Sequence, residues 1–147
     1  MNPDSQPEAV ARQPDPGTRL DGVRVMVIDD SNTIRRSAEI FLKQAGCEVI
    51  VAEDGFEALA KIVEHNPQVV FCDVMMPRLD GYQTCAVLKR NPKYRDIPVI
   101  MLTSKDGPFD RARGNLVGSD HYLTKPFTRE MLLSAVAQYA RPQQNAA

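Results

Sequence analysis

Five polar residues stand at or just past the ends of apolar runs, where their side chains could share one chemical site. Three are acids, one is a threonine and one is a lysine: Asp29, Asp30, Asp73, Thr103 and Lys125. Neighbouring carboxylates repel one another unless cations compensate them, and a single lysine offsets only part of three negative charges. Because the ligand atoms would all be oxygens, with no His or Cys among them, we expect bound Mg²⁺, with Mn²⁺ as the alternative.

The segments that must position these residues alternate between two patterns. Short β-branched apolar runs predict buried strands, and apolar residues spaced by three or four predict amphipathic helices. Predicted strands cover residues 23–28, 47–52, 69–72, 98–102 and 121–123, and predicted helices cover 32–45, 55–65, 81–90, 109–117 and a last helix from 129. Ser31 and Thr128 are expected to cap the first and last helices, and Gly46 to end the first.

Apolar positions predict which side of each helix packs inward. In the second helix we expect the apolar side to consist of Phe56, Leu59, Ile62 and Val63. In the third helix, Tyr82, Cys85 and Leu88 are expected to point inward.

Alternating buried strands and amphipathic helices predict an α/β fold, a doubly wound five-stranded parallel sheet with helices on both faces. At this size we expect the flavodoxin-like strand order 2-1-3-4-5. In such sheets ligands bind beyond the carboxyl ends of the strands, at the switch point between strands 1 and 3. The three acids follow those two strands.

Phosphoryl transfer is the chemistry that this set suits, because it needs an in-line nucleophile and groups that neutralise the phosphate oxygens. A carboxylate can act as the nucleophile and form an aspartyl phosphate. We expect Asp73 to have that role, because the strand order puts it between the acidic pair and the strands of Thr103 and Lys125. Lys125 would pair with phosphate oxygens, and the Thr103 hydroxyl would donate a hydrogen bond to one of them.

The composition limits the domain count and the class of partner. The chain of 147 residues fits one domain at 21–141, between a flexible N-terminal tail at 1–20 and a C-terminal tail at 142–147. A net charge of -1 argues against nucleic-acid binding. Without a signal peptide or a long apolar run, the protein is expected to be cytoplasmic and not inserted in a membrane. Cys47, Cys72 and Cys85 are expected to be reduced, buried thiols.

Four segments resemble the signatures of the response-regulator receiver domain, the chemotaxis-regulator-like family: VIDDS at 27–31, CDVMMPRLDG at 72–81, MLTS at 101–104 and YLTKPF at 122–127. The resemblance covers about 22–141. Within it, residues 25–36, 78–85 and 104–107 are similar to regulators of twitching motility by type IV pili.

The resemblance implies roles for the residues of the site. Asp73 would accept phosphate from a histidine kinase, and Thr103 and Lys125 would bind the phosphoryl group. The metal would be held by Asp29, Asp30, Asp73 and the backbone carbonyl of Met75.

The resemblance also implies how the signal leaves the site. Tyr122 matches an aromatic residue that turns inward on activation. Lys125–Pro126 would be a cis peptide bond, and Met75 and Lys105 match positions that tune loss of phosphate.

No output domain is expected after the last helix, so phosphorylation should change protein binding. The expected binding face is formed by the helix at 109–117, the strand at 121–123 and the last helix, with candidate residues Asp106, Arg111, Asn115, Tyr122 and Thr124. We expect a monomer or weak dimer that catalyses only its own phosphotransfer and dephosphorylation.

Three alternatives remain open at this point. A phosphatase with an aspartyl-phosphate intermediate commonly has a second acid two residues after the nucleophile, where this chain has Met75. A flavin carrier of the same fold would need a phosphate-binding loop where Asp29 and Asp30 stand. An adaptor with the receiver fold could signal without phosphate.

Overall fold

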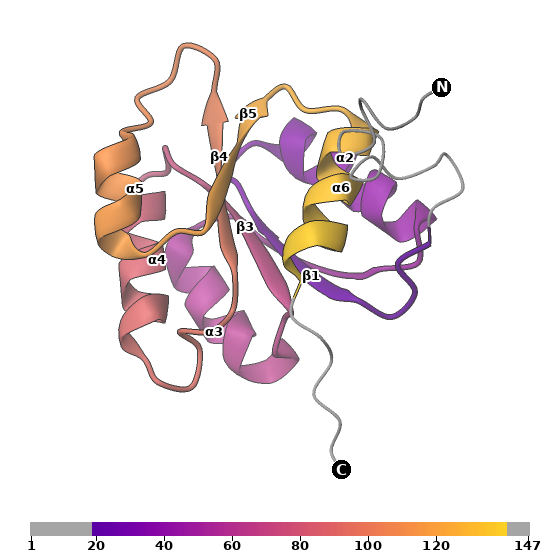
Figure 1. Ribbon diagram of the computed structural model, residues 1–147, viewed down its shortest axis with the longest axis horizontal. Coiled ribbons are helices and arrows are strands. Elements are labelled where there is room, and N and C mark those ends of the chain that lie inside the picture. Colours follow the sequence, from indigo (N-terminus) through magenta and orange to yellow (C-terminus); the bar gives the residue numbers. More distant parts are fainter. Residues whose placement is uncertain (1–18, 141–147) are drawn as a thin grey trace, which may run out of the picture.

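The computed structural model describes residues 19–140, so the two predicted tails lie outside the described residues except for Arg19 and Leu20. Five strands alternate with five helices along the chain (Figure 1). The strands are β1 (Arg24–Ile28), β2 (Glu48–Ala52), β3 (Val69–Asp73), β4 (Val99–Ser104) and β5 (His121–Lys125). The helices are α2 (Asn32–Gln44), α3 (Gly55–His65), α4 (Gly81–Arg90), α5 (Arg111–Val117) and α6 (Arg129–Tyr139).

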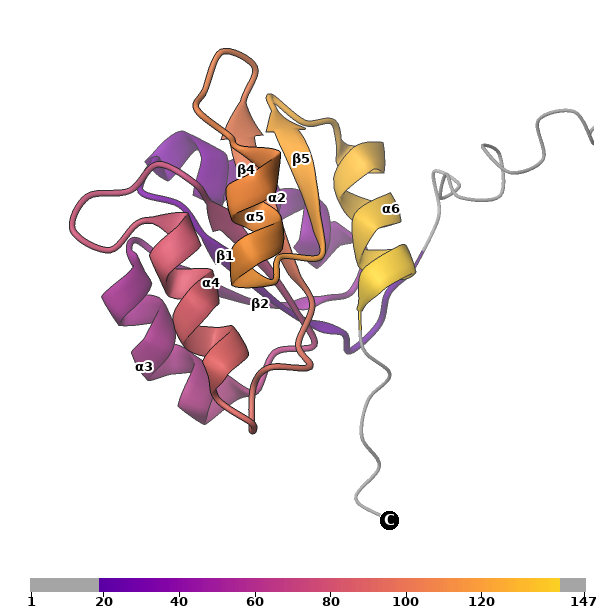
Figure 2. The same ribbon diagram turned by 60° about the vertical axis from the view of Figure 1, so that its left-hand side comes forward.

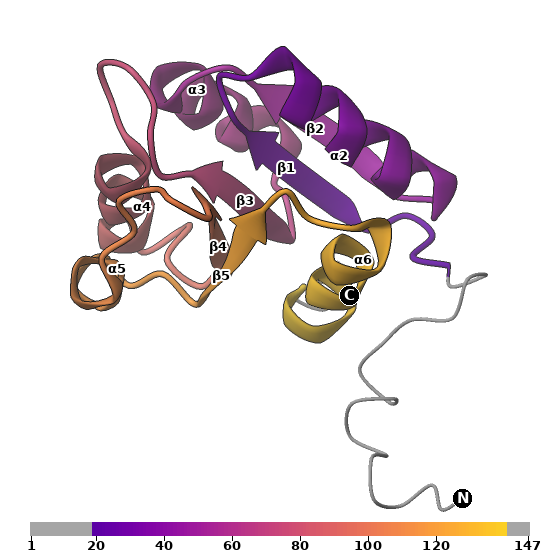
Figure 3. The ribbon, with the colours of Figure 1, turned by 90° about the horizontal axis from the view of Figure 1, so that it is seen from above.

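The strands form one parallel sheet in the order β2-β1-β3-β4-β5, which confirms the predicted fold class and strand order. Helices α2 and α6 lie on one face of the sheet and α3, α4 and α5 on the other, as Figure 3 shows from above. Successive strand residues point to opposite faces, so Val25 and Val27 join one core, whereas Met26 and Ile28 join the other. This pattern explains why the central strands are apolar at nearly every position.

Helix ends follow from local hydrogen bonds. The side chains of Ser31 and Thr128 accept backbone N–H bonds at the starts of α2 and α6, as predicted. Gly46 follows α2 with φ +98°, a left-handed conformation that glycine adopts without steric cost. At α5, Asp110 is the N-cap residue, so this helix begins at Arg111 and Phe109 precedes it.

The prediction for the inward side of α3 was partly wrong. Phe56 is 54% exposed and Val63 is 62% exposed. Gly55, Ala58 and Ile62 are the buried residues of the helix instead. The prediction relied on the larger apolar residues, because small residues contribute little to a hydrophobic pattern. In this helix the small residues belong to the face that packs inward.

Strand ends also extend further than predicted. β3 includes Asp73, β4 continues to Ser104 and β5 continues to Lys125. Within residues 19–140, no helix combines the length and apolar character that a membrane span requires. Cys47, Cys72 and Cys85 are all buried and free, as expected.

Candidate functional site

The acids gather where β1 and β3 end side by side. Ile28 pairs with Cys72 in the sheet, so Asp29 and Asp73 stand one step beyond that pair on adjacent strands. Asp29 is fully buried, Asp73 is 4% exposed and Asp30 is exposed. One carboxylate oxygen from each of the three residues lies within 4.8 Å of the others. The predicted acidic cluster is therefore present at the switch point of the sheet.

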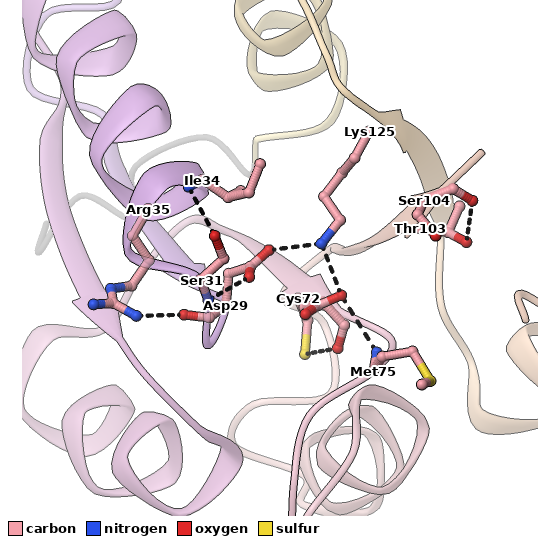
Figure 4. A network of polar contacts seen from close by, with 10 residues as sticks. Asp29, Ser31, Ile34, Arg35, Cys72, Met75, Thr103, Ser104 and Lys125 are labelled. Carbon is pink, nitrogen blue, oxygen red and sulfur yellow. Dashed lines mark hydrogen bonds and ion pairs between the residues drawn. The ribbon is translucent and has the colours of Figure 1, made fainter. Parts of the chain in front are cut away.

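Lys125 reaches this cluster from the end of β5. Its Nζ lies 3.2 Å from Oδ2 of Asp29 and 3.2 Å from Oδ1 of Asp73 (Figure 4). The lysine side chain is only 15% exposed. The peptide bond that follows, Lys125–Pro126, is cis, as the family resemblance implied. The lysine bridges two carboxylates that come from different strands.

Backbone groups hold the two buried acids in place. Oδ1 of Asp29 accepts the backbone N–H of Ser31 at 2.9 Å, and Oδ1 of Asp73 accepts that of Met75 at 3.3 Å. The Arg35 guanidinium donates to the backbone carbonyl of Asp29 at 2.7 Å. This arginine contact could not be predicted from the sequence, because it depends on the direction in which the turn before α2 points a carbonyl group.

The electrostatics of the cluster favour a proton on Asp73. Burial raises the pKa of the Asp73 carboxyl to about 7, and the charge of Asp29 acts in the same direction. Lys125 and the Met75 amide oppose this increase in pKa. Burial acts to lower the pKa of Lys125, but the charges and hydrogen bonds of Asp29 and Asp73 raise it overall. A divalent cation bound beside Asp73 would favour the ionised carboxylate.

The residues present fit a hard divalent cation. Three carboxylates face one lysine, and Asp30 has no ion pair among residues 19–140. This leaves two formal negative charges uncompensated when all three acids are ionised, which a divalent cation would balance. Oxygen ligands with one exposed side suit Mg²⁺, which usually retains several waters.

A cavity of about 530 Å³ opens beside the cluster. Asp30, Met75, Tyr82 and Arg113 are among the residues that line it. Met75 itself is 61% exposed at the mouth of the site. The cluster can therefore be reached from solvent on the side of Asp30, although Asp29 is buried.

Thr103 occupies the predicted strand end but its hydroxyl does not contact the acids. The Thr103 side chain is buried, and its Oγ1 donates to the Ser104 carbonyl at 3.3 Å, apart from the Lys125 amine in Figure 4. Thr103 pairs in register with Thr124 on β5, two residues after Tyr122. The threonine is thus placed between the acidic cluster and the edge of the sheet.

The predicted output residues lie around α5 and β5. Asp106, Arg111 and Asn115 are exposed, and Tyr122 and Thr124 are half-buried. The Arg111 guanidinium lies 4.9 Å from the centre of the Tyr122 ring and donates to its hydroxyl.

An aromatic stack beside Tyr122 was not predicted from the sequence, although Tyr82 was expected to point inward. The Phe109 ring stacks on Tyr122 with centroids 4.9 Å apart and on Tyr82 at 6.3 Å. The Tyr82 hydroxyl accepts the Asp110 backbone N–H at 2.6 Å, so it also fixes the start of α5. The spacing of these residues along the chain carries no signal for such a stack.

The chain was compared with known families and proteins. A profile of the response regulator receiver domain matches residues 25–137. Protein PilG of Pseudomonas aeruginosa is 64% identical over 116 residues, which cover 79% of this chain and 86% of PilG. The probable transcriptional regulator ycf27 of Cyanophora paradoxa is 41% identical over 122 residues, and the match spans 50% of its length.

A solved structure agrees with these sequence matches. The chemotaxis protein CheY4 of Vibrio cholerae superposes with a TM-score of 0.76 and 35% sequence identity. The match covers 80% of this chain and 98% of that protein.

Proposed function

This chain belongs to the family of response regulator receiver domains, and we propose that residues 21–141 form a switch operated by phosphorylation of Asp73. The observation that carries the proposal is the Lys125 amine, which bridges Asp29 and Asp73 at the carboxyl edge of the sheet. Receiver domains are signalling switches. We therefore propose that this one catalyses only the gain and loss of its own phosphoryl group.

The proposed reaction uses the free oxygen of Asp73. Oδ1 accepts hydrogen bonds from Lys125 and Met75, whereas Oδ2 has no hydrogen-bond partner within residues 19–140. Oδ2 would attack the phosphorus of a phosphohistidine, the new O–P bond would replace the N–P bond, and the imidazole would leave with its electron pair.

Charge compensation in this reaction comes from two sources. Lys125 already lies 3.2 Å from Asp73 and would pair with a phosphate oxygen. Mg²⁺, held by Asp29, Asp30, Asp73 and the Met75 carbonyl, would neutralise the phosphate oxygens when it is bound. Rotation of the Thr103 side chain would bring its hydroxyl toward the phosphoryl group.

The proposed donor is a histidine kinase and the proposed output is a change in protein binding. Movement of Thr103 would free space on the path of Tyr122, which would then leave Arg111 and Phe109. The surface formed by α5, β5 and α6, with Asp106, Asn115 and Thr124, would change its partner affinity. An element as short as α5 can move at modest cost.

The process that we propose is control of twitching motility through type IV pili. The 64% identity to PilG supports this choice, together with the resemblance of residues 25–36, 78–85 and 104–107 to such regulators. We further propose a cytoplasmic monomer or weak dimer. Buried, unpaired thiols at Cys47, Cys72 and Cys85 suit a reducing compartment.

Phosphorylation in vitro tests this proposal. The protein is incubated with phosphoramidate and Mg²⁺, and its intact mass is measured. We expect one added phosphoryl group, no adduct in Asp73→Asn, and no adduct when the metal is chelated. A wild-type protein that stays unlabelled with every small phosphodonor and with a histidine kinase would favour a phosphate-independent adaptor.

A further inference from the structure

The groove between α4 and α5 has lining residues that are not among the predicted output residues. The two helices lie side by side on the same face of the sheet (Figure 2). A hollow of about 290 Å³ runs between their C-terminal halves, and its lining residues are Ala86, Lys89, Arg90, Leu116, Val117 and Gly118. It is separate from both the cavity beside the acids and the surface around Tyr122.

One strongly exposed apolar side chain, Leu116, marks this groove. Leu116 is 85% exposed, more than any other large apolar residue among those described. Val87 on α4 is 41% exposed but does not line the groove. Single exposed apolar residues are ordinary, but a leucine at the edge of a groove with an apolar floor offers an anchor point for a partner.

The charge of this surface is positive, although the whole chain has a net charge of -1. Neither α4 nor α5 contains an acidic residue, and together they carry the four cations Lys89, Arg90, Arg111 and Arg113. Of these, only Lys89 forms an ion pair within the described part of the chain, with Asp120 at 3.0 Å.

Cations without an ion pair among the described residues stand on both helices: Arg90 lines the groove, whereas Arg113 lies outside it and lines the cavity beside the acids. Arg90 lies at the C-terminal end of α4, beside Leu116. Arg113 lies on the first turns of α5, where its guanidinium is 4.1 Å from the centre of the Tyr82 ring. A positive group on each helix, next to an apolar hollow, is complementary to an amphipathic segment that also carries acidic residues.

We propose that the α4–α5 groove binds an acidic amphipathic helix of a partner protein. An apolar side chain of that helix would pack against Leu116 and Ala86, and its carboxylates would pair with Arg90 and Arg113. The apolar anchor favours a protein over nucleic acid, which would need a continuous basic stripe. The groove residues do not contact Asp73, but one wall of the groove is α5, the element that the proposed switch would move.

A peptide titration tests the proposal. The probe is a synthetic helical peptide with leucines spaced by three and four residues and glutamates elsewhere, added to ¹⁵N-labelled protein. We expect amide shifts confined to residues 82–90 and 111–118, and binding that weakens with added salt. The same peptide with lysine in place of glutamate should not bind.

Three variants test which residues are responsible for peptide binding. Leu116→Glu and Arg90→Glu should each weaken binding about tenfold or more. Both side chains are exposed, so the variants should fold, which their ¹⁵N spectra verify. Lys43→Glu is the control for Arg90→Glu, because it also replaces a cation by an acid but lies on α2, on the other face of the sheet. It should bind the peptide like the wild type.

Several outcomes would overturn the inference. These are an absence of peptide binding, equal binding by Leu116→Glu, or shifts located on α5, β5 and α6 only. If duplex DNA bound in place of the peptide, and Arg90→Glu but not Leu116→Glu abolished that binding, the surface would be a nucleic-acid site instead.

Discussion

Asp73 is the proposed phosphoacceptor, and its surroundings work against its charge. It is 4% exposed and stands beside the buried Asp29, and these conditions raise its pKa to about 7. In the unfolded chain the same carboxyl has an ordinary value near 3.8. The folded, metal-free protein therefore holds a proton on Asp73 over a pH range in which the unfolded chain has lost it.

The raised pKa predicts that Asp73→Asn stabilises the metal-free protein at pH 8. Between about pH 4 and pH 7 the native state binds more protons than the unfolded state, so the free energy of unfolding falls as the pH rises through this range. The neutral side chain of asparagine does not ionise, so the variant avoids this loss of stability at high pH. We expect the variant to be more stable than the wild type by up to about 4 kcal/mol at pH 8, with little difference near pH 4.

Urea unfolding followed by circular dichroism at several pH values measures this difference. Asp96→Asn provides the control, because Asp96 is an exposed acid outside the cluster and its replacement should change stability by less than about 0.5 kcal/mol. An Asp73→Asn protein less stable than the wild type at pH 8 would mean that Lys125 outweighs burial and repulsion.

At the scale of elements, the strand ends position the acids and the start of α4 closes against them. Gly81, the first residue of α4, packs directly on the backbone of β3 and its loop. A Cβ atom at this position would lie 2.3 Å from the Asp73 carbonyl oxygen and 2.9 Å from Cα of Val74. Since both neighbours are backbone atoms, they cannot move without displacing Asp73.

We predict that Gly81→Ala destabilises the protein by more than about 2 kcal/mol and reduces phosphorylation of the folded fraction. The matched control is Gly22→Ala, which has open space around the new Cβ but a φ of +78°. That variant should lose only about 1 kcal/mol through backbone strain and keep full phosphorylation. Chemical unfolding and the phosphoramidate assay measure both effects; equal losses in the two variants would rule out the steric explanation.

Much of the element layout could be predicted from the sequence. Strands buried on both faces and helices with caps have distinct patterns, and the rule for parallel sheets then brought Asp29, Asp73 and Lys125 to one edge. The exposure of Phe56 and Val63 was not predictable in this way. Gly55 faces Leu79 and Thr84 so closely that α3 packs through its small residues, and the larger ones are left outside.

Contacts that depend on the direction of a side chain could not be predicted from the sequence either. The Arg35 bond to the Asp29 carbonyl and the stack of Phe109 on Tyr122 need the three-dimensional arrangement of a turn and a loop. Neither contact follows a sequence period, because the partners come from segments with no regular repeat.

At the scale of the whole molecule, the site joins the two halves of the core. Lys125 extends from the edge strand β5 to acids on β1 and β3, and the sheet separates α2 and α6 from α3, α4 and α5. Charge balance at this one edge should therefore affect the stability of the entire domain.

We predict that Mg²⁺ raises the melting temperature of the wild-type protein. At an Mg²⁺ concentration ten times the dissociation constant, binding to the native state alone adds about 1.4 kcal/mol to the free energy of unfolding. Asp30→Asn should lose most of this gain while folding normally, because Asp30 is exposed and has no ion pair within residues 19–140. Thermal unfolding with Mg²⁺ and with a chelator measures the effect. An equal rise in melting temperature in the variant would mean that the metal does not bind at this cluster.

The central claim is that the phosphoryl group is carried on Asp73, and chemical trapping tests it most directly. The protein is phosphorylated with phosphoramidate and Mg²⁺, treated with borohydride, which reduces an acyl phosphate to an alcohol, and digested for peptide sequencing by mass spectrometry. We predict homoserine in place of aspartate at position 73 and at no other position. Homoserine at position 29 or 30, or none at all in a protein that carries phosphate, would contradict the claim.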